Sequence, residues 1–142
     1  MTDRRLRLTA VVLALLGTGV AGYLVYVHYA GVAPICSISH GCETVQHSRY
    51  AKLAGVPVAV IGLAGYVGIL VALVALRDEA SRLAAAGMAL VGAGFSGWLT
   101  YLEGARIHAW CQWCLASAGL MALLCVVTVW RLLAAPQAAA DV

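Results

Sequence analysis

Charged residues are scarce in this chain, and their scarcity excludes most soluble folds. Only 11% of the 142 residues are charged, whereas 63% are hydrophobic. A soluble domain carries roughly 25% charged residues with which to cover its surface. A chain so poor in charge needs lipid as its solvent. Nucleic-acid binding is also unsupported, because the sequence contains no basic patch with interleaved aromatic residues.

Asp, Glu, Lys, Arg and His are missing altogether from four long apolar runs: 8–27, 56–76, 83–102 and 110–130. Each run is about 20 residues long, which as a helix spans a hydrocarbon core of about 30 Å. Within lipid these runs must be helical, because every backbone amide needs an internal partner. We therefore expect a single domain over residues 1–142, an all-α, four-helix transmembrane bundle. Ion pumps and proton-coupled transporters are disfavoured, because their pathways need ionisable groups inside the membrane.

The few basic residues are distributed unevenly around these runs. Six arginines precede the first run, separate the second from the third, or follow the fourth: Arg4, Arg5, Arg7, Arg77, Arg82 and Arg131. Three basic residues lie on the other side: Arg49, Lys52 and Arg106. The positive-inside rule then places both termini in the cytoplasm. The basic start suggests a signal peptide, but the first run exceeds the roughly 7–15 residues of such a segment, so we expect an uncleaved span.

The outward connection 29–55 is much longer than the other connections and contains more polar residues than either of them. Long loops in compact domains are usually functional or disordered. We expect the stretch "CETVQHSRYAKLAG" to form a short helix that ends at Gly55 and is stopped by Pro57. The second outward connection, 103–109, is short. At the outer end of the first run, three tyrosines look like an interfacial belt: Tyr23, Tyr26 and Tyr29.

The cysteines are the remaining candidates for functional residues. Four of the five cysteines fall on the outward, oxidising side, where thiols tend to become disulfides: Cys36, Cys42, Cys111 and Cys114. The first two lie in the long connection, and the last two form a C-x-x-C where the fourth run begins. We expect the fifth, Cys125, to be a small buried hydrophobic residue.

The C-x-x-C spacing places its two sulfurs at neighbouring positions on a helix. A helix N-terminus also stabilises a thiolate through its free N–H groups and its dipole. A c-type haem would need a histidine after the second cysteine, and that position holds Leu115. Two alternatives stay open, a purely structural disulfide and a zinc site built from Cys36, His40, Cys42 and His47.

Two cysteine pairs favour a redox relay, because thiol–disulfide exchange needs pairs that can meet. The loop pair can face a soluble partner and then bend towards the C-x-x-C, which is flanked by Trp110 and Trp113. A lipid-soluble quinone is the natural electron acceptor at that depth, and aromatic walls suit its ring.

The motifs that carry these cysteines resemble the vitamin K epoxide reductase family, specifically its bacterial members. The matching stretches are "CSISHGCETVQHS" from Cys36, "GVPVAVIGLAGY" from Gly55, "FSGWLTYLE" from Phe95 and "CQWC" from Cys111. The resemblance implies an inner-membrane bundle that encloses a quinone, either ubiquinone or menaquinone. It also implies an enzyme that forms disulfide bonds in a separate, exported, thioredoxin-like (DsbA-like) protein.

The resemblance also implies roles for individual residues. Cys114 would be the cysteine closest to the quinone, and Cys111 would exchange with the loop pair through Cys42. The site residues expected near the quinone are Cys114, Ser48, Trp113 and Phe95.

The chain departs from the vertebrate members at two positions. Ala118 and Val58 stand where those members carry a Tyr and an Asn associated with hydrogen bonding to the quinone head. Their absence favours plain quinone reduction over epoxide reduction.

Two further hypotheses are kept. One is a quinone reductase of different ancestry, the DsbB-like family, although that group has its C-x-x-C in the first outer loop. The other is a non-enzymatic membrane scaffold or metal-binding subunit with structural disulfides.

Overall fold

The computed structural model describes residues 3–31, 52–53, 55–75, 79–107 and 112–140. This part of the chain forms four long helices: α1 (Asp3–Ala30), α3 (Val58–Ala75), α4 (Glu79–Leu102) and α5 (Gln112–Ala140). By length and composition, all four can span a membrane. The predicted all-α, four-helix membrane bundle is therefore confirmed.

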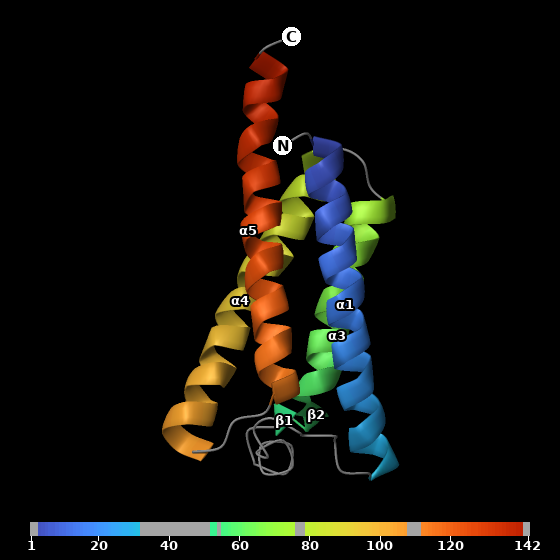
Figure 1. Cartoon of the computed structure of the whole chain (residues 1–142), viewed down its shortest axis with the longest axis vertical. Helices are drawn as coiled ribbons and strands as arrows, with labels where there is room; N and C mark the ends of the chain where they lie inside the picture. Colours follow the sequence, from blue (N-terminus) through green and yellow to red (C-terminus); the bar gives the residue numbers. More distant parts are fainter. Residues whose placement is uncertain (1–2, 32–51, 54, 76–78, 108–111, 141–142) are drawn as a thin grey trace.

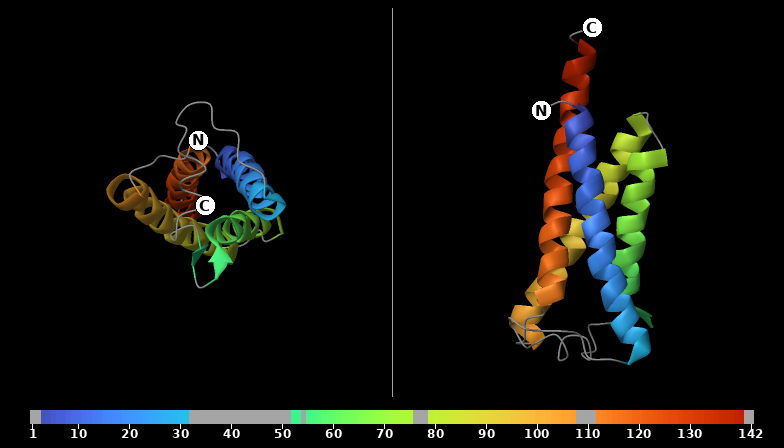
Figure 2. Two further views of the ribbon diagram at one scale, coloured as in Figure 1. Left: turned by 90° about the horizontal axis from the view of Figure 1, so that it is seen from below. Right: turned by 45° about the vertical axis from the view of Figure 1, so that its right-hand side comes forward.

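The helices surround one another in the order α1, α3, α4, α5, and each packs against its two neighbours in this ring (Figure 2). The two chain termini lie at one end of the bundle, which we call the terminal end (Figure 1). The last turn of α1 and the first turns of α3 and α5 lie at the other end. We call it the hairpin end, after the strand pair described below.

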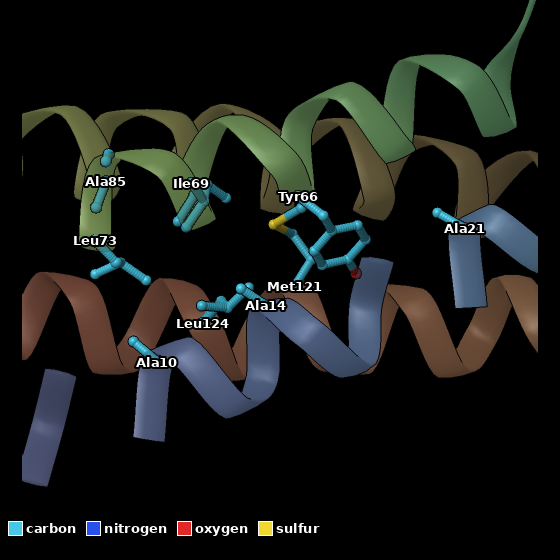
Figure 3. Packing of buried hydrophobic residues seen from close by; sticks show 11 residues of the cluster. Ala10, Ala14, Ala21, Tyr66, Ile69, Leu73, Ala85, Met121 and Leu124 are labelled. Carbon is cyan, nitrogen blue, oxygen red and sulfur yellow. The ribbon is translucent and has the colours of Figure 1, made fainter. Parts of the chain in front are cut away.

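Small residues let the helices approach closely in the core. Alanines from α1 and α4 face larger side chains from α3 and α5 (Figure 3). The buried cluster contains Ala10, Ala14, Ala21, Tyr66, Ile69, Ala72, Leu73, Ala85, Ala89, Met121 and Leu124. Helix association in lipid depends on such packing, because lipid tails are as apolar as the side chains themselves.

The terminal end is held by polar contacts to the last turn of α3. The Arg7 side chain donates a hydrogen bond from Nε to the Leu73 carbonyl oxygen, across 2.8 Å. The Ser81 hydroxyl, which is fully buried, donates to the Ala72 carbonyl oxygen. Carbonyls in the last turn of a helix have no partner within the helix, so these contacts satisfy groups that lipid could not.

Two short strands precede α3. β1 (Lys52–Leu53) pairs antiparallel with β2 (Val56–Pro57), with Lys52 opposite Pro57 and Leu53 opposite Val56. The predicted short helix is therefore wrong over residues 52–53, and its remaining residues up to 51 lie outside the described part. Gly55 has a φ of 83°, so it supplies the left-handed residue of a tight turn instead of a helix cap.

The end of α4 also differs from the expected short connection at 103–109. A single π-helical segment, η2 (Glu103–Ile107), continues α4 beyond Leu102. The first residue of this segment, Glu103, is only 3% exposed. The sequence predicts an outward loop at this position, so the burial of Glu103 differs from that prediction.

Candidate redox site

Cys114 lies in the first turn of α5, which begins at Gln112. Its side chain is half-buried at the hairpin end of the bundle. The first turn of a helix presents backbone N–H groups and the positive end of the helix dipole. The predicted environment of this cysteine, a helix N-terminus at the rim of the bundle, is the one that the structure shows.

The tryptophan before Cys114 packs against α1. The ring centroids of Trp113 and Tyr23 are 4.7 Å apart, with the two rings inclined at 44°. Of the three tyrosines predicted to form an interfacial belt, Tyr26 and Tyr29 are indeed exposed, at 65% and 68%. Tyr23 is half-buried instead, because it lies on the face of α1 that meets α5.

One helical turn after Cys114, α5 is bonded to α3. The Tyr66 hydroxyl donates a hydrogen bond to the Ser117 carbonyl oxygen across 2.6 Å. The Ser117 hydroxyl lies 3.0 Å from the same Tyr66 oxygen, so the two hydroxyls also share a hydrogen bond. Tyr66 is 1% exposed, and Figure 3 shows its side chain reaching from α3 into the core.

Sequence reasoning missed both residues of this contact. A signal was available, because Tyr66 is the one residue of α3 whose side chain carries a polar atom. A buried tyrosine hydroxyl usually finds a hydrogen-bond partner. Which helix would provide that partner could not be read from the sequence.

Three of the predicted catalytic cysteines and one predicted quinone-binding residue lie outside the described residues: Cys36, Cys42 and Cys111, and Ser48. The elements that flank the long connection are described: the end of α1 and strand β1 lie at the hairpin end, as does the start of α5, where Cys114 is found (Figure 1). The connection with the loop cysteines therefore starts and ends on the side of the bundle where α5 presents its thiol. The residues of the alternative zinc site also fall outside the described part.

Phe95, the predicted quinone-lining residue of α4, is half-buried. It lies one turn before Trp98, which stacks on Tyr101 with ring centroids 5.8 Å apart. Both of these rings are 57% exposed. Among the described rings, Trp113 pairs with Tyr23 and not with Phe95, so a joint role for Phe95 and Trp113 stays a prediction.

Cys125 lies deeper in α5, half-buried and packed against the core cluster. Its surroundings are apolar, which agrees with the expected role as a small hydrophobic residue.

The fold and this site define a polytopic membrane protein with a thiol at the mouth of a four-helix bundle. Residues 8–129 match the model of the Vitamin K epoxide reductase family, and the chain belongs to that family. It is accordingly a membrane thiol–disulfide oxidoreductase, of a family that is generally linked to quinones. Membership also answers the question of ancestry, against the DsbB-like alternative.

Proposed function

We propose that this protein oxidises a separate, exported, thioredoxin-like protein and delivers the electrons to a quinone of the bacterial inner membrane. The observation that carries the proposal is the position of Cys114. This thiol lies in the first turn of α5, half-buried, at the end of the bundle where both flanks of the long connection lie. We expect a half-buried thiol there to exchange with the loop cysteines on one side and with a quinone on the other.

The proposed relay transfers two electrons through two successive thiol–disulfide exchange reactions. A thiolate of the partner attacks the Cys36–Cys42 disulfide, and the second partner thiol resolves the mixed disulfide, so that the partner is oxidised and the loop pair reduced. The Cys42 thiolate then attacks Cys111 in the Cys111–Cys114 disulfide and releases Cys114 as a thiolate. Cys36 closes the loop disulfide and frees Cys111. The C-x-x-C pair now holds the two electrons.

Regeneration of the Cys111–Cys114 disulfide needs an acceptor that accepts two electrons and two protons, which is the chemistry that a quinone supplies when bound. The described residues fit such a group, because an aromatic pair, Trp113 and Tyr23, lies directly beside the thiol-bearing turn. Ser48 and Phe95 are the other residues that we expect to hold it. During this step the α5 N-terminus stabilises the Cys114 thiolate before Cys111 closes the bond.

The distribution of arginines supports the orientation that the relay requires. Arginines from three helices lie at the terminal end, in the first turns of α1, the first turn of α4 and the last turns of α5: Arg4, Arg5, Arg7, Arg82 and Arg131. By the positive-inside rule, this distribution supports an orientation with both termini in the cytoplasm and the thiol of Cys114 on the extracytoplasmic side.

The test is turnover in proteoliposomes with a reduced thioredoxin-like protein and a short-chain ubiquinone or menaquinone. We expect Cys111→Ser and Cys114→Ser to abolish quinone reduction, because each breaks the pair that delivers electrons. Cys125→Ser is the matched control, since it removes a thiol from the same helix, and it should keep most of the activity. Normal turnover in both C-x-x-C variants would refute the proposal.

A further inference from the structure

The first two turns of α5 are held on both sides of Cys114 by tyrosines from two other helices. Tyr23 of α1 packs against Trp113, the residue before the cysteine. Tyr66 of α3 is hydrogen-bonded to Ser117, three residues after it. Residues three apart on a helix share a face. The turn that carries the thiol is therefore bracketed by one aromatic contact and one pair of hydrogen bonds.

Tyr66 itself has little freedom to move. Its ring lies against the backbone of Gly17 in α1, where a Cβ would come within 2.1 Å of the ring carbon Cε1. The side chain is almost fully buried, and its hydroxyl contacts both the carbonyl and the hydroxyl of Ser117. A shift of α5 along α3, or a rotation about its own axis, would break these hydrogen bonds and leave the buried Tyr66 hydroxyl without a partner, which is costly.

We propose that Tyr66 is a positioning residue for the Cys114 thiol. Its ring is fixed by Gly17, and its hydroxyl holds Ser117, so the depth and rotation of the first two turns of α5 are set from α3. Exchange and electron delivery at a thiolate depend on the placement of the sulfur, and an error of about 1 Å in a reacting group can cost roughly a hundredfold in rate. This role rests on the proposed function, because it makes Cys114 the reacting thiol.

Tyr66→Phe separates positioning from packing, because it removes the hydroxyl and keeps the ring against Gly17. The matched control is Tyr26→Phe, which removes a hydroxyl from a tyrosine of the same end that is 65% exposed. The first readout is the alkylation rate of Cys114 in the fully reduced protein, followed by mass spectrometry of the Cys114 peptide. The second is the split of quinone reduction into kcat and KM in proteoliposomes.

In Tyr66→Phe we expect Cys114 to be alkylated at least about fivefold faster, because one ordinary hydrogen bond corresponds to about that factor and the variant loses both bonds to Ser117. The half-buried thiol would become more accessible as the turn loosens. We expect kcat to fall by a similar factor, while KM for the thioredoxin-like protein stays at its original value. Tyr26→Phe should match the unmodified protein in both readouts. An unchanged alkylation rate in Tyr66→Phe would overturn the proposal, even if the variant were less stable to heat.

Ser117 variants test the same contact from the other side. Ser117→Ala removes the shared hydroxyl and keeps the carbonyl acceptor, so it should accelerate alkylation less than Tyr66→Phe does. The double variant should behave as Tyr66→Phe alone, because both changes act through one contact and are not additive. Ser117→Thr retains a hydroxyl and should restore the slow rate. Additive effects in the double variant would contradict a shared contact.

The two proposals fail separately. Retained turnover in both Cys111→Ser and Cys114→Ser would refute the proposed relay. The alkylation rate of Cys114 would still test whether Tyr66 positions the turn that carries this thiol. If Tyr66→Phe does not fold, the comparison of Ser117→Ala with Ser117→Thr decides. Equal alkylation rates in these two variants and the unmodified protein would refute a positioning role.

Discussion

Gly17 of α1 lies directly against the aromatic ring of Tyr66 in α3, closely enough that a Cβ at position 17 would be 2.1–2.5 Å from three ring carbons. No real side chain tolerates such distances, so an alanine there must displace the ring. Because Tyr66 also bonds α5, this contact ties α1 to the helix that carries Cys114. The glycine at position 17 leaves the space that the Tyr66 ring occupies.

Gly17→Ala should therefore destabilise the bundle. Forcing an extra carbon into a packed core costs about 1–3 kcal/mol, and we expect a lower midpoint of thermal unfolding in detergent. Gly19→Ala is the matched control, because position 19 is exposed on the same helix and a Cβ there meets no described atom within 4 Å. Equal midpoints for the two variants would contradict the close approach.

Gly92→Ala should be milder than Gly17→Ala, although its Cβ would also be close to a side chain. The nearest atom is the sulfur of Met121, at 2.8 Å. Methionine is flexible and can move aside, and alanine favours helix more than glycine does. We expect the unfolding free energy to change by less than about 1 kcal/mol. A loss of unfolding free energy as large as that of Gly17→Ala would show that the Met121 side chain cannot move aside.

Trp113→Ala should impair the site more than it impairs the fold. The variant loses the contact with Tyr23, and an aromatic pair of this kind contributes about 0.5–1.5 kcal/mol beyond burial. Since Trp113 is also a residue expected to face the quinone, we predict a raised KM for a short-chain quinone in proteoliposomes. Trp98→Ala is the control, because that ring is 57% exposed on α4. Equal KM values for the two variants would show that Trp113 does not contribute to quinone binding.

Arg7→Gln should lower stability at the terminal end, because it removes the hydrogen bond to the Leu73 carbonyl. A hydrogen bond from a charged group contributes about 1.5–3 kcal/mol. Arg4→Gln removes the same charge from an exposed position of α1 and leaves that bond in place. A lower midpoint of thermal unfolding in Arg7→Gln than in Arg4→Gln would therefore report the contact and not the net charge, whereas equal midpoints would assign any effect to charge alone.

The four helices and the class of chemistry could be predicted from the sequence. Four charge-free runs of membrane length have no other stable form in lipid, because each backbone amide must be bonded within its own segment. The cysteine-bearing motifs were specific enough to predict the family that the match over residues 8–129 then showed. The position of Cys114 followed as well, since a C-x-x-C where an apolar run begins must lie at a helix N-terminus.

Local sequence was a poor guide where segments bond to distant partners. Leu53 belongs to a strand and not to a helix, because Val56 pairs with it across the turn at Gly55. Glu103 is buried in a π-helical extension of α4 although its charge marks it as a loop residue.

The contacts that hold the turn of Cys114 could not be predicted from the sequence, because they join residues from different helices. Tyr66 and Ser117 are 51 positions apart in the chain, and no periodicity within either helix indicates that they meet. The sequence contains fifteen glycines, and nothing in it indicates that Gly17 is the one that contacts the Tyr66 ring. Helix formation in lipid is a local consequence of composition, whereas the rotation and depth of each helix depend on which side chains interlock across the bundle.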